Sequence, residues 1–387
     1  MAETKHLVEV TFDAADEYRP EPPAPPEIPA WKDGSIRIGI HTSIAGDLSR
    51  SLDIAAGLGA NALQIFSASP RMWDRSISRI APVDAERFRA RRQELALGPL
   101  VIHCNYLLNL ASPNPVLQAR SVQALHQEIV RALALGADCL VLHPGSHPTT
   151  QNRPWDPAGS AVMSDNRVAT SAVARGIRQA ARGLKLNGLR ILLENTAGQG
   201  SALGSRLEEL TAILQACRDL PLGVCVDTAH LFAAGWDIRT AEGLEKALFD
   251  LERAIGIEHV PVIHANDSKA PLGSRVDRHE HIGKGKIGLE AFRRILNHPL
   301  LSSCAFILET PIDKPGDDKR NVATLWKLVG RTVKATGTRD GFGIRRQRAP
   351  KGDPSTPCAR TRRGKAGRRP ATAQDGKTNS FRRLRGR

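Results

Sequence analysis

The hydrophobic pattern of this chain consists of short apolar runs that alternate with amphipathic segments. Eight runs of strand length occur, and each is followed by apolar residues at helical spacing. The helical segments are Leu48–Leu58, Asp84–Leu95, Pro115–Leu135, Arg167–Leu184, Arg206–Cys217, Glu242–Ile255, Leu289–Leu296 and Asp318–Val333. Strict alternation of strand and helix predicts a parallel sheet with right-handed crossovers. Eight units in roughly 300 residues fit an α/β fold of the closed (β/α)8, or TIM, barrel type.

An open doubly wound sheet is the competing architecture. It requires a glycine-rich phosphate turn after the first strand, and His41-Thr-Ser-Ile-Ala-Gly46 is not such a turn. The barrel is therefore the predicted fold. Its active site is expected at the C-terminal ends of the strands.

Side chains that can bind a metal recur at the ends of the apolar runs. Seven of the eight runs end on such a residue, namely His41, His103, His143, Glu194, Asp227, His264 and Glu309. Only the second run, Ala62–Phe66, ends without one, at Ser67. A single buried His or Asp is usually a hydrogen-bonded structural residue, but seven at one position indicate a common metal centre.

Three further candidates lie just past strand ends: His230, Asp277 and His279. Imidazole and carboxylate donors together suit zinc, manganese or iron(II). The candidates are too many for one ion, whereas nine ligands with one of them bridging suffice for three. For His41, His147 and His281, a role behind the ligands or facing phosphate competes evenly with a plain structural role. The glycine-rich Gly283–Gly288 is a weak phosphate-loop signal.

Composition separates a core from two flanking segments. Residues 1–34 form a Pro-rich acidic arm, residues 35–336 the predicted barrel, and residues 337–387 a basic low-complexity tail; we expect both flanks to be disordered. The net charge is +15, and 16 Lys or Arg against 3 Asp or Glu give residues 339–387 a charge of +13. No run is long enough to span a membrane, and no signal-peptide layout is present, so we expect a cytoplasmic protein.

Several segments together resemble the endonuclease IV family, the metal-dependent apurinic/apyrimidinic (AP) endonucleases of base-excision repair. The resemblance covers about Ile36 to Leu328. The segments are Ser43-Ile-Ala-Gly46, Asn109-Leu-Ala-Ser112, His143-Pro-Gly-Ser-His147, Glu194-Asn-Thr-Ala-Gly-Gln-Gly200, Gly223-Val-Cys-Val-Asp-Thr-Ala-His230, Ala265-Asn-Asp-Ser-Lys269, Gly273-Ser-Arg-Val-Asp-Arg-His279 and Ile307-Leu-Glu-Thr310.

The resemblance implies three zinc ions, with manganese or iron(II) as alternatives at some sites. The first ion would be held by His103, His143 and Glu194. Glu194 would bridge to a second ion, which is also held by Asp227, His264 and Glu309. The third would be held by His230, Asp277 and His279. Glu194 and Glu309 are the residues that we expect to be catalytic.

The resemblance also implies an activity and a substrate. Double-stranded DNA would be hydrolysed on the 5′ side of an abasic site, leaving a 3′-hydroxyl, and 3′-blocked ends would be trimmed as well. Arg71, Tyr106 and Leu107 correspond to the residues that probe the DNA. The Ser69-Pro70 context before Arg71 departs from the better-known members of the family. With this resemblance we expect a bacterial, nucleoid-associated monomer whose basic tail adds nonspecific nucleic-acid contacts.

Two other functions compete with this interpretation. A sugar isomerase or epimerase on the same barrel would need only Glu194, Asp227, His264 and Glu309, which can hold one metal. It would not need the remaining five ligands or the DNA-probing residues. A non-catalytic DNA-binding protein driven by the tail is the second alternative, and a tail that only aids solubility is its simplest form.

Overall fold

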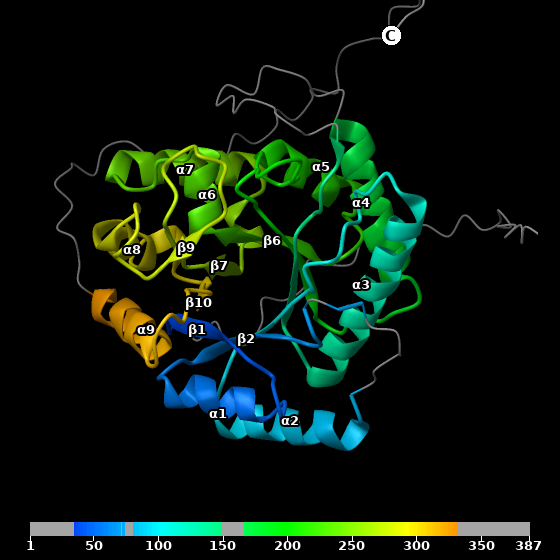
Figure 1. Ribbon diagram of the computed structural model, residues 1–387, viewed down its shortest axis with the longest axis horizontal. Helices are drawn as coiled ribbons and strands as arrows, with labels where there is room; N and C mark the ends of the chain where they lie inside the picture. Colours follow the sequence, from blue (N-terminus) through cyan, green and yellow to red (C-terminus); the bar gives the residue numbers. More distant parts are fainter. Residues whose placement is uncertain (1–34, 71, 74–79, 149–165, 331–387) are drawn as a thin grey trace, which may run out of the picture. The chain divides into compact units, whose positions relative to one another are not determined.

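The computed structural model describes residues 35–70, 72–73, 80–148 and 166–330. Its eight barrel strands are β1 (Arg37–Thr42), β2 (Ala62–Phe66), β3 (Leu100–His103), β4 (Cys139–Leu142), β5 (Arg190–Glu194), β6 (Leu222–Asp227), β7 (Val262–His264) and β10 (Ala305–Leu308). All pair in parallel and close in the order β1-β10-β7-β6-β5-β4-β3-β2 (Figure 1). The predicted barrel is thus confirmed. The predicted arm and tail lie outside the described residues, so the domain boundaries stay predictions.

The helices of the described chain surround this barrel (Figure 1). Those that match the predicted segments are α1 (Arg50–Gly57), α2 (Pro82–Glu94), α3 (Pro115–Leu135), α4 (Asn166–Ala181), α5 (Leu207–Ala216), α7 (Ala241–Ala254), α8 (Leu289–Leu296) and α9 (Asp317–Leu328). None of the described helices is both long and apolar enough to cross a membrane.

Several short elements escaped the sequence pattern. They are α6 (Thr228–Ala234), the 3-10 helices η2 (Ile257–His259) and η3 (Pro299–Leu301), and the antiparallel pair β8 (Asp267–Ser268) and β9 (His279–Glu280). Every residue of α6 is buried, so this helix has no polar face and no amphipathic period. The pattern therefore could not predict it.

Helix α3 shows why the predicted limits can coincide with the observed ones. The Asn114 side chain accepts hydrogen bonds from the backbone N–H groups of Val116 and Leu117, and Pro115 occupies the first helical turn. At the other end Gly136 adopts φ +66°, a left-handed conformation that suits glycine. Both end signals are local, so the sequence determines them directly.

Small and apolar side chains fill the part of the barrel interior below the C-terminal ends of the strands. We call this set the apolar layer: Ala62, Val101, Cys139, Val141, Leu192, Cys225, Val262 and Ile307. On β1 the corresponding residue is Gly39, where an added Cβ would lie 2.8 Å from the Ala62 carbonyl carbon. The apolar layer therefore fills the barrel interior, and an active site is expected at the C-terminal ends of the strands.

Candidate metal centre

A ring of polar side chains lies directly above the apolar layer. Because strand side chains alternate between two faces, a residue two positions after an interior residue also points inward. On each strand, the residue two positions after the last residue of the apolar layer, or after Gly39 on β1, is polar. We call these residues the polar layer: His41, Gln64, His103, His143, Glu194, Asp227, His264 and Glu309. The second strand therefore also contributes a polar residue to the barrel interior. This residue is Gln64, within the strand, and not Ser67 at its end.

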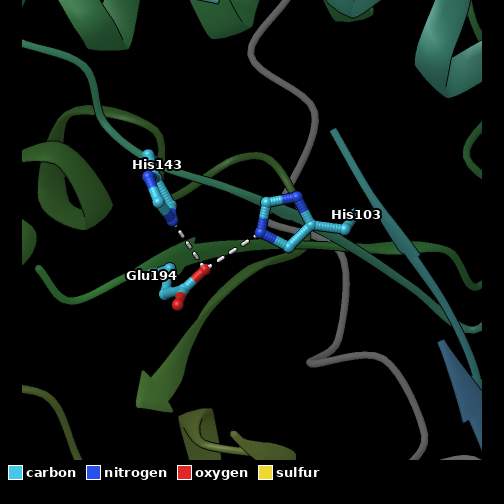
Figure 2. Close-up of side chains that lie close together, drawn as sticks. All are labelled: His103, His143 and Glu194. Atoms are coloured by element: carbon cyan, nitrogen blue, oxygen red, sulfur yellow. Dashed lines mark hydrogen bonds and ion pairs between the residues drawn. The ribbon is translucent and has the colours of Figure 1, made fainter. Parts of the chain in front are cut away.

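The structure brings the predicted ligands of the first ion together. Glu194 Oε2 lies 3.2 Å from His103 Nε2 and 3.1 Å from His143 Nε2 (Figure 2). Glu194 is fully buried, whereas the His143 side chain is 34% exposed, so the group opens towards solvent on one side. The ligand atoms of all three residues lie within 4.8 Å of one another.

A second group adjoins the first through Glu194. It consists of Glu194, Asp227, His264 and Glu309, again with ligand atoms within 4.8 Å of one another. His264 Nδ1 lies 3.1 Å from Glu194 Oε1 and 3.2 Å from Glu309 Oε2. Glu194 therefore faces the two groups with different oxygens, an arrangement in which a carboxylate can bridge two ions.

The third group differs in one member from the predicted set. His230 and His279 gather with Asp227, which the sequence assigned to the second ion alone. The predicted Asp277 lies beside them, with Oδ1 3.2 Å from His230 Nε2 and 3.4 Å from His279 Nε2. All nine predicted ligands thus converge, and Asp227 adjoins both the second and the third group. That they bind ions stays a prediction.

The imidazoles are oriented by groups behind them. Backbone carbonyls can only accept, so His103 Nδ1 donates to Cys104 O at 2.6 Å, His230 Nδ1 to Asn195 O at 3.0 Å and His279 Nδ1 to Glu309 O at 3.2 Å. Each bond places a proton on Nδ1, so that in the neutral imidazole the lone pair of Nε2 faces the carboxylates. This is the arrangement in which histidines serve as metal ligands.

The residues also fit a cation electrostatically. His230 Nε2 and His279 Nε2 are buried and face Asp277 Oδ1 at 3.2 and 3.4 Å, so each points at a carboxylate oxygen. Burial by itself would raise the pKa of Glu194, but the positive charge of protonated His264 and His143, with hydrogen bonds from protonated His103 and His143, holds this pKa well below its ordinary value. The site thus stabilises a buried carboxylate with positive charge, and a bound cation would take the place of the imidazole protons.

Helix α6 follows β6 directly and places His230 beside Asp227, so that the end of one strand contributes two predicted ligands. The Asp227 side chain accepts a hydrogen bond from His230 N at 2.7 Å and so caps the helix. Asn195 Oδ1 accepts from Asp227 N at 2.6 Å, and Asn266 Nδ2 donates to Asp227 Oδ2 at 2.6 Å. These two amides, like Gln64, were missed by the sequence reasoning. Their signal was an uncharged polar residue at or near a strand end.

The predicted DNA-probing residues lie beside the first group. Tyr106 is 58% exposed and Leu107 half-buried. Together with Trp73, His103 and His143 they line a pocket of about 500 Å³. The Tyr106 backbone N–H donates to Pro70 O at 3.2 Å, which ties the loop after β3 to the loop after β2. Arg71 itself lies outside the described residues.

The glycine-rich loop Gly283–Gly288 is not arranged to receive phosphate. The buried Asp267 carboxylate accepts hydrogen bonds from the backbone N–H groups of Gly283, Gly285 and Ile287, at 2.9, 3.0 and 2.9 Å. These are the donors that a phosphate would use. An internal carboxylate occupies them, so the weak phosphate-loop signal is not supported.

The three histidines left open by the sequence have separate surroundings. His41 Nδ1 is 2.9 Å from Gln64 Nε2 and 3.6 Å from Glu309 Oε1, which places it behind the ligands; burial lowers its pKa. His281 lies 3.4 Å from Asp313 and 3.0 Å from Asn321, away from the three groups. His147 is buried, and its backbone N–H donates to Ser201 O.

Comparison with known proteins agrees with this site. A family model described as "Xylose isomerase-like TIM barrel" matches residues 52–327. "Probable endonuclease 4" of Solibacter usitatus is 49% identical over 298 residues, covering 76% of this chain and 97% of that relative. The crystal structure of endonuclease IV from Thermus thermophilus is 38% identical with a TM-score of 0.64, covering 76% of this chain and 98% of that one.

A D-tagatose 3-epimerase-like protein shares the fold alone, at 21% identity and a TM-score of 0.52, over 76% of this chain and 97% of that one. The two endonuclease relatives are matched over nearly their whole length and at much higher identity. The chain belongs to the endonuclease IV family of hydrolytic nucleases.

Proposed function

We propose that this enzyme hydrolyses double-stranded DNA at the phosphodiester on the 5′ side of an abasic nucleotide, leaving a 3′-hydroxyl. The observation that carries the proposal is the set of three ligand groups joined through Glu194 and Asp227. A single-metal sugar isomerase or epimerase would need only the second group. The first and third groups, with the exposed Tyr106 and the half-buried Leu107 beside the first, favour a nuclease over that alternative.

Zinc fits the donor set, because imidazole and carboxylate ligands without thiolates are typical of catalytic zinc, with manganese or iron(II) as alternatives. We assign His103 and His143 to the first ion, His264 and Glu309 to the second, and His230, His279 and Asp277 to the third. Glu194 would be shared by the first two ions, and Asp227 would join the second. Bound ions would supply the Lewis acidity that activates water and neutralises charge on the phosphate.

The two glutamates take different parts in this scheme. Glu194 is fully buried between imidazoles and anchors the centre. Glu309 is 15% exposed, so its carboxylate can reach a substrate. We assign Glu309 to orienting the attacking water and Glu194 to holding the two neighbouring groups at a fixed separation.

Specificity would come from the rim of the site. An abasic nucleotide has no base to unpair, so extruding it from the helix costs little. Tyr106 and Leu107 could fill the gap left in the stack, as apolar wedges do in other DNA-bending proteins, and Arg71 would join them. The same site would trim 3′-blocked ends. A monomer acting in the bacterial cytoplasm is part of this proposal.

The test is incision of a duplex that contains a single abasic site, with an undamaged duplex as the control. We expect a cut 5′ to the site and a product that a polymerase extends. A chelator should abolish the reaction, and added zinc should restore it. Absence of incision by zinc-loaded protein, together with turnover of a sugar, would overturn the proposal.

A further inference from the structure

Gln64 is the one member of the polar layer whose side chain is an uncharged amide and not a His, Asp or Glu side chain. It lies in the middle of β2, fully buried, two residues after Ala62 of the apolar layer. A buried amide needs partners for both its donors and its acceptor. Gln64 finds all of them in the polar layer.

The contacts of Gln64 join two predicted ligands of the second ion. Nε2 donates to Glu309 Oε1 at 2.5 Å, and Oε1 lies 2.8 Å from His264 Nε2. The second N–H of the amide faces His41 Nδ1 at 2.9 Å. One side chain of β2 thus links the polar residues of β1, β7 and β10.

These contacts fix the direction of the amide and the tautomer of His264. An ionised carboxylate only accepts, so the nitrogen of Gln64 must face Glu309 and its oxygen must face His264. His264 then donates from Nε2, so that in the neutral imidazole the lone pair is on Nδ1. That atom is the one that faces Glu194 and Glu309, at 3.1 and 3.2 Å.

His264 is held differently from the other oriented histidines. His103, His230 and His279 donate to backbone carbonyls, which no substitution can remove. They present Nε2 to the centre, whereas His264 presents Nδ1. The orientation of His264 therefore depends on side chains, namely Gln64, which faces Nε2, and the Cys225 thiol, which also hydrogen-bonds the imidazole.

We propose that Gln64 is a positioning residue for the second metal group: it holds His264 with Nδ1 free and turns Glu309 towards the same point. This inference rests on the proposed metal centre and goes beyond it by assigning a function to β2, which supplies no ligand. His41 completes the arrangement by accepting the second amide N–H, which stops the amide from rotating.

The first test is zinc binding by the full chain with Gln64→Leu, which is apolar and of similar size. Competition with a chromophoric chelator should show one of three ions bound about 10- to 100-fold more weakly, the usual effect of losing a group behind a ligand. The other two ions should bind as in the wild type. Thermal unfolding of the metal-free protein should change little.

Asn61→Leu is the matched control. Asn61 lies just before the same strand, at the opposite end of the barrel. Its Nδ2 donates a hydrogen bond to Ile36 O at 2.9 Å, and its Oδ1 accepts one from Ile38 N at 2.8 Å. It should cost stability and leave all three zinc affinities unchanged. If Gln64→Leu fails to fold, Gln64→Ala fits the same space and should weaken the same ion.

The outcomes separate this inference from the proposed function. Three wild-type zinc affinities in both Gln64 variants would overturn the role of Gln64, whatever the incision assay shows. Wild-type protein that binds three ions but does not cut abasic DNA would overturn the proposed function alone. Wild-type protein that binds no zinc would overturn both.

Discussion

The apolar and polar layers of the barrel differ by only two positions along each strand. Leu192 and Glu194 lie on the same strand and face the same interior, yet one packs against apolar neighbours and the other lies among four imidazoles. The strand supplies the same stiff support in both places. Whether an interior position provides stability or chemistry therefore depends on its height in the barrel, because only the upper ring opens to solvent and substrate.

The strongest way to break the polar layer is Glu194→Gln. The substitution keeps the shape and removes the charge shared by the first two groups, so incision should fall about 100- to 1000-fold or more, as when preorganised electrostatic groups are lost. Steady-state incision of an abasic duplex measures this. Circular dichroism should show a folded protein.

Glu208→Gln is the control for that substitution. Glu208 is 56% exposed on α5, so its neutralisation should leave incision unchanged. Comparable losses in the two variants would mean that Glu194 has no special part in the centre.

Leu192→Ala breaks the apolar layer directly beneath. Leu192 is fully buried, and its truncation should lower the free energy of unfolding by about 2 to 5 kcal/mol. Zinc stoichiometry at low temperature should stay at the wild-type value. Denaturant unfolding and metal analysis together measure the two effects; loss of ions from the folded variant would show that the layers are not separable.

A buried carboxylate outside the barrel interior sharpens the comparison. Burial raises the pKa of Glu209 to about 7, only partly offset by a hydrogen bond from Gly204 N at 2.7 Å. Glu194, surrounded by imidazoles, shifts the opposite way. Burial alone therefore does not decide the charge of a carboxylate here; its partners do.

The sign of the Glu209 effect follows from linkage. Between the ordinary pKa of 4.5 and about 7 the folded state holds the proton and the unfolded state has lost it, so the stabilisation present below pH 4.5 disappears as the pH rises to 7. Glu209→Gln should remove this dependence, making the protein more stable than wild type at pH 8 by about 1 to 3 kcal/mol. Unfolding free energies at pH 5 and 8 test it; equal slopes in the two proteins would contradict it.

The sequence predicted the barrel and a pool of ten candidate ligands because both follow from local rules, whereas the resemblance to the endonuclease IV family selected nine of the ten and left His41 out. Alternation along strands and the position of His, Asp and Glu at strand ends need no knowledge of neighbours. Gln64, Asn195 and Asn266 could not be found this way, since an amide gains its role only from what the barrel places against it. The contact of Asp227 with the third group likewise depends on the spatial path of α6, which carries no amphipathic signal.

The smallest expected effect on incision comes from the basic tail, whose residues 339–387 carry 16 Lys or Arg against 3 Asp or Glu. This charge can bind phosphate backbones but supplies no pocket that distinguishes an abasic nucleotide. Truncation before Gly337 should therefore weaken DNA binding at low salt. The slope of log K against log salt concentration should become shallower by about 0.9 for each phosphate contact that is lost. The preference for abasic over intact duplex should remain, because we assign it to the polar layer and to the Tyr106–Leu107 rim. Binding titrations over a range of salt concentrations, with both duplexes, measure the two quantities separately. A truncated protein that binds both duplexes equally would place specificity in the tail and not in the barrel.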